Sequence, residues 1–309
     1  MRAEINNSDG NQRMYPMLGA SLLLQLFLYW TKSLVLSGIT ALFSKKAYFA
    51  YVYGAVNTVT LIAVFLVPTL FFLRLSDCRF RELMHPVRSE KIGNSSDRLP
   101  FVFCAAITLN VANLAGMLTD TLCSALNAEI PKVTLSGDAW TLANGFLTTV
   151  IITPIMEELL FRGVALRVLS ESGRRNAVIV SAMLFALMHY ELYPLFYAFC
   201  AGAVIAYFSY SANSFLYAIG LHAVNNAVTF GIALVERTYG AETANIVSAI
   251  ILIVSVILAI VGIAIMLIKR RNYAVNPPKS VDSIKQMLCP ETATYAILAL
   301  TVCVFNSFA

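Results

Sequence analysis

The sequence predicts an all-α, polytopic transmembrane helix bundle, and two observations on composition carry this prediction. Of the 309 residues, 59% are hydrophobic and only 13% are charged, and the mean hydropathy is +0.73. Soluble globular domains carry roughly 45–50% apolar and about 25% charged residues. So little charge cannot cover a water-facing surface on a chain of this length. Composition therefore excludes an ordinary soluble enzyme, a disordered protein and a disulfide-stapled secreted module.

Apolar segments long enough to cross a membrane recur along the whole chain. A spanning helix needs about 20 mainly apolar residues. The candidate spans are residues 15–36, 49–73, 100–119, 140–161, 176–190, 194–211, 214–235, 243–268 and 291–308. The fifth and the last are short, and we leave open whether the last crosses. We therefore expect about eight or nine spans in a single membrane domain over residues 1–309.

The distribution of loop cations predicts the orientation. Crossings that start inside the cell place 17 of the 22 Lys and Arg residues in cytoplasmic loops and 4 in the opposite loops. Cytoplasmic loops carry the excess of Lys and Arg, so we expect a cytoplasmic N-terminus. These basic residues are scattered through loops between apolar spans. This argues for a lipid bilayer as the partner and against nucleic acid. Lys32, near the end of the first span, is expected to extend toward the interface.

The ionisable residues inside the predicted spans are concentrated in three of them. Glu157 and Glu158 are the acidic residues deep within a span, and His189 and His222 lie in later spans. Counted from the predicted span ends, Glu157, His189, His222 and Asn226 lie roughly 12–20 Å from the cytoplasmic face. Polar groups in a membrane are costly and mark function. We expect the chemistry of the protein at this depth.

The first cluster pairs two carboxylates with one cation. Glu158 and Arg162 are four residues apart, so they share a helix face and can pair. Glu157 lies about 100° round the helix and needs a different partner, as a general base would. The alternative is a Glu–Arg pair at a helix end, with Glu157 among the headgroups. Because the apolar run continues to Leu169, the helix can extend and place Glu157 deeper.

Two further pairs lie four residues apart on later spans. Phe185 and His189 share one helix face, and so do His222 and Asn226. Each pair also has a purely structural interpretation. A lone intramembrane His is often a hydrogen-bonded structural group, and His and Asn side chains can join helices to one another.

Together the three clusters resemble the CAAX-protease and bacteriocin-processing family, the CPBP or Abi-type intramembrane proteases. Its pattern is E-E-x-x-x-R, then F-x-x-x-H, then H-x-x-x-N/D on successive transmembrane helices, and the resemblance covers residues 140–235. It implies an endopeptidase in which Glu157 and His189 bind and deprotonate a water while His222 and Asn226 stabilise the oxyanion. Glu158, held by Arg162, and Phe185 would be supporting residues.

The resemblance leaves cofactor and substrate open. Members have also been described as metalloproteases, in which case Glu157, His189 and His222 would bind zinc. We favour a metal-free glutamate mechanism, because Asn226 suits oxyanion donation better than zinc ligation. The expected substrate is a peptide or protein, lipid-modified or membrane-embedded, and short loops without an endoplasmic-reticulum retention signal favour a bacterial plasma-membrane protein. The alternative function is a non-hydrolytic transporter or bacteriocin-immunity binding protein that uses the same polar cluster.

Overall fold

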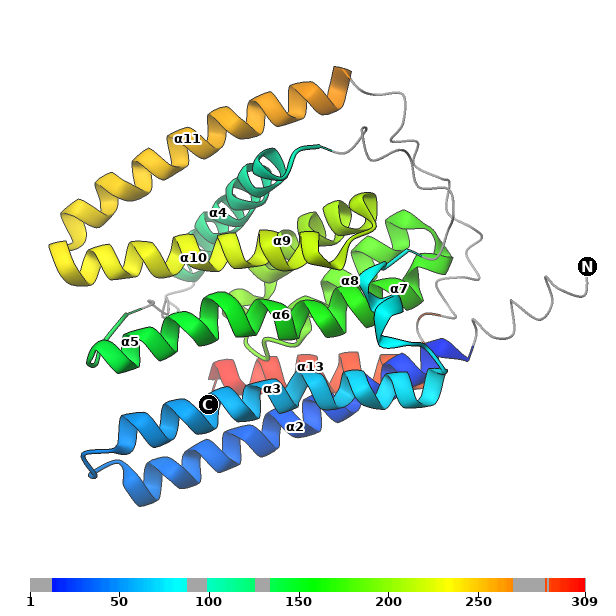
Figure 1. The fold of residues 1–309 in the computed structure, drawn as a ribbon, viewed down its shortest axis with the longest axis horizontal. Coiled ribbons are helices and arrows are strands. Elements are labelled where there is room, and N and C mark those ends of the chain that lie inside the picture. Colours follow the sequence, from blue (N-terminus) through cyan, green and yellow to red (C-terminus); the bar gives the residue numbers. More distant parts are fainter. Residues whose placement is uncertain (1–12, 88–98, 126–133, 269–286, 288, 309) are drawn as a thin grey trace, which may run out of the picture.

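The computed structural model describes residues 13–87, 99–125, 134–268, 287 and 289–308. Within these ranges the regular elements are all helical, as predicted. The chain begins with an antiparallel hairpin of two long apolar helices, α2 (Met14–Phe43) and α3 (Phe49–Ser76), which lie along one side of the bundle (Figure 1). A short 3₁₀ turn, η1 (Phe80–Met84), follows α3.

The central element is one continuous helix made of five consecutive segments. These are α5 (Ala139–Phe146), the π-helical η3 (Leu147–Ile152), α6 (Thr153–Glu158), the π-helical η4 (Leu159–Ala165) and α7 (Leu166–Leu169). Asp138 caps its start, accepting a hydrogen bond from the backbone N–H of Thr141 at 2.9 Å. All residues of η4 and α7 are buried. A helix buried all round must lie at the centre of its domain, so the helix does continue past Glu157 as expected.

The next two helices form a hairpin whose turn is partly buried, with Met188 and Tyr190 inside and Glu191 exposed. A 3₁₀ turn, η5 (Ser170–Ser172), and Gly173 at φ 89° lead into α8 (Arg174–Leu187), and the chain returns as α9 (Leu192–Ala212). Our predicted span over 176–190 was therefore wrong at its C-terminal end. His189 lies in the turn formed by residues 188–191, which we call the His189 turn, and not on a helix.

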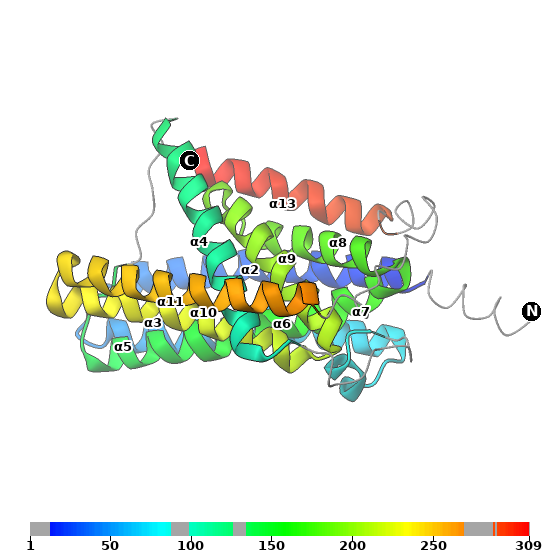
Figure 2. The same cartoon turned by 90° about the horizontal axis from the view of Figure 1, so that it is seen from above.

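The remaining helices pack around this centre (Figures 1 and 2). They are α4 (Phe101–Ala125), α10 (Phe215–Tyr239), α11 (Ala241–Ile268) and α13 (Pro290–Phe308). The α10 helix runs beside α6, and α4 packs against α9 and α11. The C-terminal α13 packs on α2 and also touches α8 and α9. These contacts place α13 against the helical hairpin that bears His189.

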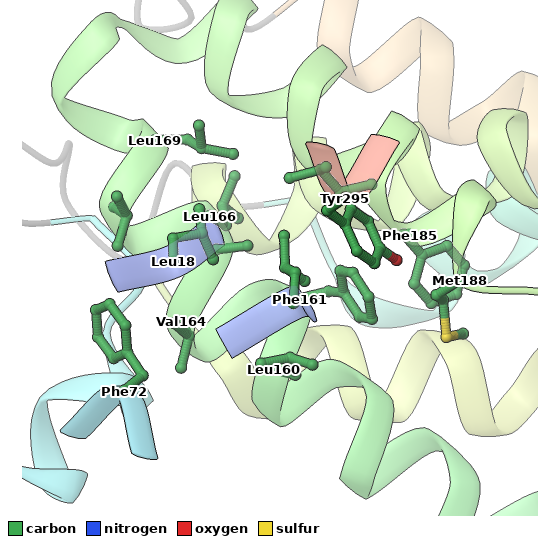
Figure 3. Close-up of a cluster of buried hydrophobic side chains, with 14 of the residues drawn as sticks. Leu18, Phe72, Leu160, Phe161, Val164, Leu166, Leu169, Phe185, Met188 and Tyr295 are labelled. Carbon is green, nitrogen blue, oxygen red and sulfur yellow. The ribbon is translucent and has the colours of Figure 1, made fainter. Parts of the chain in front are cut away.

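Two clusters of buried apolar side chains hold the bundle together. The larger gathers around η4 and α7 and receives residues from α2, α3, α8 and α13, including Leu18, Phe72, Phe161 and Tyr295 (Figure 3). The smaller joins α4, α9 and α10. The outer face of α11 instead exposes a run of large apolar residues. An apolar exterior of this kind suits contact with lipid.

Six helices in the described ranges are long and apolar enough to cross a membrane. They are α2, α3, α4, α9, α10 and α11, and each coincides with a predicted span. The other three predicted spans correspond to the composite helix, to the short α8 and to α13. The protein is therefore a multi-pass membrane protein, while the total of eight or nine spans and the orientation stay predictions. Most of the predicted cytoplasmic loop 269–290 lies outside the described residues.

Candidate active site

Glu158 connects two of the three sequence motifs. Its Oε2 lies 3.1 Å from Nε of Arg162, which confirms the predicted pairing. Its Oε1 lies 2.8 Å from Nδ1 of His222, on α10. Glu158 and Arg162 are both fully buried. One oxygen of this buried carboxylate faces the guanidinium of Arg162 and the other is hydrogen-bonded to His222, so the charge of Glu158 is compensated within the protein.

Arg162 is held by contacts beyond Glu158. Its Nη2 donates to the carbonyl of Gly202 at 3.0 Å, and its guanidinium lies 4.3 Å from the ring centroid of Phe185. A Cβ atom on Gly202 would lie 2.9 Å from Phe185 and 3.3 Å from Arg162. The close approach of α9 to this arginine therefore depends on a residue without a side chain.

Glu157 approaches the same imidazole from its other side. Its Oε2 lies 3.8 Å from Nε2 of His222, longer than a hydrogen bond. We expected Glu157 to have a partner different from that of Glu158, and this was only partly right because His222 lies between the two carboxylates. Glu157 nonetheless remains free to act on a ligand, since it also lines a cavity described below.

Phe185 packs against both histidines. Its ring centroid lies 5.3 Å from that of His189 and 5.8 Å from that of His222, each in an edge-to-face arrangement. Phe161 makes a similar contact at 5.5 Å. These contacts pack the ring of Phe185 against both imidazoles, while its supporting role in catalysis stays a prediction.

The ring of His189 keeps a defined orientation, although α8 ends two residues before it. Nδ1 of His189 lies 3.1 Å from the carbonyl oxygen of Phe185. A carbonyl can only accept, so Nδ1 carries the proton and Nε2 is left as an acceptor. The four-residue spacing of the motif therefore places a ring with a defined tautomer at the site, although the residue lies in a turn.

The C-terminal helix holds the His189 turn. Tyr190 adopts φ 55°, a left-handed conformation that is strained for a bulky residue. Its carbonyl accepts a hydrogen bond from Nδ2 of Asn306 at 2.8 Å, and the N–H of Leu192 donates to Oγ of Ser307 at 3.0 Å. The hydroxyl of Tyr190 donates to Oε1 of Gln25 at 2.5 Å. Sequence reasoning missed this role of α13, because nothing local marks the two contacts.

Asn226 lies on α10 one turn beyond His222, and its side chain is engaged with the backbone. Its Nδ2 donates to the carbonyl of Thr149, within π-helical η3, at 2.9 Å. In this segment Thr153 N–H bonds to the carbonyl five residues earlier. The equivalent donor for Thr149 would be residue 154, which is Pro154 and has no N–H. Asn226 replaces that donor with one of its two amide hydrogens and keeps the other.

A cavity of about 160 Å³ lies beside Glu157 and His189. Its other lining residues come from α2, α3 and the His189 turn, namely Gln25, Tyr29, Lys32, Leu61, Val64, Phe65 and Met188. His222 and Asn226 are not among the lining residues. The structure thus brings Glu157 and His189 to one cavity, with His222 behind Glu157 and Asn226 a turn further along α10. Lys32 faces this cavity, whereas we expected it to extend toward the interface.

The described residues do not form a metal site in this arrangement. No group of three His, Cys, Asp or Glu side chains in this part of the chain is placed to hold a metal ion. Glu158 already occupies Nδ1 of His222. That contact leaves Nε2 as the ring nitrogen on the side of Glu157. Because Glu157, His189 and His222 are not gathered around one point in this arrangement, we derive no step through a metal.

The fold and the site define a class: a multi-pass helical membrane protein in which a buried glutamate and a partly buried histidine line one small cavity. Comparison with known families is consistent with this class. Residues 139–228 match the family model described as "Type II CAAX prenyl endopeptidase Rce1-like". The match contains all seven motif residues and confirms the resemblance to the CAAX-protease family over this region. Comparisons with curated proteins and with solved structures gave no match.

Proposed function

We propose that the protein is an intramembrane endopeptidase in which Glu157 and His189 activate a water molecule. One observation carries the proposal: Glu157 of α6 and His189 of the His189 turn, 32 positions apart in sequence, line the same cavity. Glu158 is compensated by Arg162 and His222. Glu157 makes only the longer contact of 3.8 Å with Nε2 of His222, and is the carboxylate able to exchange a proton with a ligand.

The proposed reaction begins with a water between Glu157 and His189. Nε2 of His189, unprotonated because Nδ1 donates to Phe185, accepts one hydrogen bond from the water. Glu157 takes the other proton as the oxygen adds to the peptide carbonyl carbon. The C–N bond then breaks, and the leaving nitrogen takes the proton from Glu157. Atoms and charge balance without a further reactant.

His222 and the free amide hydrogen of Asn226 are proposed to stabilise the tetrahedral oxyanion. Nδ1 of His222 is bonded to Glu158, so the ring is held with Nε2 on the side of Glu157. Protonation of Nε2 would make it a charged donor to the oxyanion. Asn226 keeps one donor after its bond to Thr149.

The experiment compares membrane and secreted peptides from cells that express the wild-type protein or Glu157→Gln. We expect peptides that appear only with the wild type, and the same loss with His189→Ala. Glu242→Gln and His85→Ala are matched controls, because both residues are exposed and lie outside the site. All variants must accumulate in the membrane at similar levels. Peptide profiles identical between the wild type and Glu157→Gln would refute the proposal.

For the substrate and the metal, we keep the expectations from the sequence. The substrate is a membrane-associated peptide or protein, lipid-modified or membrane-embedded, and the protein belongs to the bacterial plasma-membrane branch. We also propose that no zinc is required. Activity of purified protein is therefore expected to survive a chelator, whereas loss of activity restored by added zinc would point to a metal enzyme.

A further inference from the structure

One polar side chain of α4 lies on the outside of the helix without a partner in the described part of the chain. Asn110 donates to the carbonyl of Ala106 at 2.8 Å, and Thr121 donates to that of Met117 at 2.7 Å. Asn113, in contrast, is exposed, and its side chain forms no hydrogen bond with any described residue. Its carboxamide can donate two hydrogen bonds and accept two.

Asn113 lies halfway along a helix that is long and apolar enough to cross a membrane. It is the middle residue of α4, which has 25 residues, so roughly 18 Å of helix lies on either side of it. The residues after it pack on α9, where a Cβ on Gly116 would lie 3.9 Å from Tyr197 and Asp120 accepts a hydrogen bond from Tyr193. Lipid chains offer no hydrogen bonds. An exposed amide at this depth therefore costs free energy unless another helix satisfies it.

The exposed side of α4 has a pattern that suits packing against a second helix. Two neighbouring rows of exposed side chains with four-residue spacing run along it, namely Asn113, Met117 and Thr121 in one row and Leu114, Leu118 and Leu122 in the other. Rows at this spacing form the ridges and grooves through which helices pack. The opposite side of α4 is already used, since it buries small residues such as Ala112 and Ala115 and packs against α9 and α11.

We propose that the exposed side of α4 is an interface between two copies of this chain, related by a two-fold axis with Asn113 at its centre. Two copies in one membrane have the same orientation, so their α4 helices run parallel. A residue near the axis then meets its own counterpart at the same depth.

The carboxamide favours a second copy as the partner. It is complementary to another carboxamide, because each supplies the donor and the acceptor that the other needs. A single Asn among apolar residues specifies register and the number of helices in parallel coiled coils. The α4 helix lies outside the region that matches the family model, and the inference does not depend on the proposed function.

The test measures self-association of the purified protein in liposomes of phosphatidylethanolamine and phosphatidylglycerol. Copies with a donor or an acceptor fluorophore on a C-terminal tag are mixed, and energy transfer is followed as lipid is added. We expect transfer that falls on dilution and on addition of unlabelled protein. Asn113→Leu should raise the dissociation constant about tenfold, as for the loss of interhelical hydrogen bonds. Asn113→Gln should retain most of the affinity.

Asn110→Leu is the matched control, because this residue of the same type on the same helix bonds to its own backbone. Its dissociation constant should equal that of the wild type. Added cysteines locate the interface. On oxidation, Met117→Cys should give more disulfide-linked dimer than the native cysteines do, whereas Ile257→Cys, on the exposed face of α11, should not.

Three results would overturn the inference. The first is a wild type without energy transfer above the level that excess unlabelled protein leaves, which would reserve this face for a different protein. The second is an unchanged dissociation constant in Asn113→Leu. The third is a lower thermal unfolding midpoint of Asn113→Leu in excess detergent, where the protein is monomeric, because this would assign Asn113 a role inside its own bundle. We expect that midpoint to be unchanged or higher.

Discussion

Nδ1 of His222 lies 2.8 Å from Oε1 of Glu158, while Nε2 of the same ring lies 3.8 Å from Oε2 of Glu157. Two adjacent carboxylates thus meet opposite edges of one imidazole. The first contact is a hydrogen bond that fixes the ring, and the second is long enough to rearrange when a ligand enters. Orientation of a functional histidine by a carboxylate behind it is a common arrangement. It explains why the sequence needs two successive glutamates.

The Glu158–Arg162 pair should stabilise the bundle only as a pair. Arg162→Met leaves the buried Glu158 without its counter-charge, so we expect a loss of about 3–5 kcal/mol. The double variant Glu158→Gln with Arg162→Met should recover much of this loss, because no buried charge remains unpaired. Thermal unfolding in detergent measures both. A double variant less stable than Arg162→Met alone would contradict the expectation.

Two glycines offer a matched test of packing around Arg162. Gly202→Ala places a Cβ 2.9 Å from Phe185, and overpacking of this kind costs about 1–3 kcal/mol. Gly231→Ala, in α10, meets no atom within 4 Å, and should gain up to about 1 kcal/mol from helix propensity. Unfolding midpoints of the two variants should therefore move in opposite directions. A shift of the same sign in both would indicate that α9 can move away from Arg162.

The contact between Asn226 and Thr149 should depend on Pro154. Asn226→Ala leaves the carbonyl of Thr149 without its donor, a loss of about 1–3 kcal/mol. In a Pro154→Ala background, residue 154 regains an N–H for that carbonyl, so the same change should cost less. A double-mutant cycle on unfolding free energy measures this coupling. Purely additive effects would mean that Pro154 does not create the need for Asn226.

Asn306 is expected to be a positioning residue for His189. Asn306→Ala removes the hydrogen bond to the carbonyl of Tyr190, so we expect a several-fold lower kcat with little change in KM, because Asn306 does not line the cavity. Amide hydrogen exchange in the His189 turn should become faster, and Asn306→Gln should restore part of both. Thr301→Ala is the control on the same helix, since its hydroxyl bonds to its own helix at the carbonyl of Ile297. Equal effects of the two alanine variants would assign α13 a general packing role.

The long apolar helices could be predicted from the sequence because hydropathy determines them directly. The pairing of Glu158 with Arg162 could be predicted as well, because it depends only on helical spacing. The end of α8 could not, since no glycine or proline follows Leu187 to mark it before Tyr190. That residue turns into a left-handed conformation where its polar groups meet Gln25 and Asn306, more than a hundred residues away in each direction.

The cavity was missed for a similar reason. Gln25 and Lys32 stand 132 and 125 positions before Glu157, and no local pattern connects them with the motifs. A signal was nevertheless present. Gln25 and Lys32 lie at the spacing of one helix face within a mainly apolar span. This spacing indicates a surface that faces something other than lipid. The π-helical segments had a weaker signal in the sequence, namely Pro154, which has no N–H to donate.

The separation of the cavity walls from the acid–base residues has an evolutionary consequence. The residues proposed to cut the bond belong to α6 and to the His189 turn, whereas six of the nine residues that line the cavity belong to the hairpin of α2 and α3. Substitutions in this hairpin can therefore change the shape of the cavity without touching Glu157 or His189. Relatives with identical motifs need not share a substrate. Exchanging residues 14–76 between two of them would be the direct way to exchange their substrate preferences.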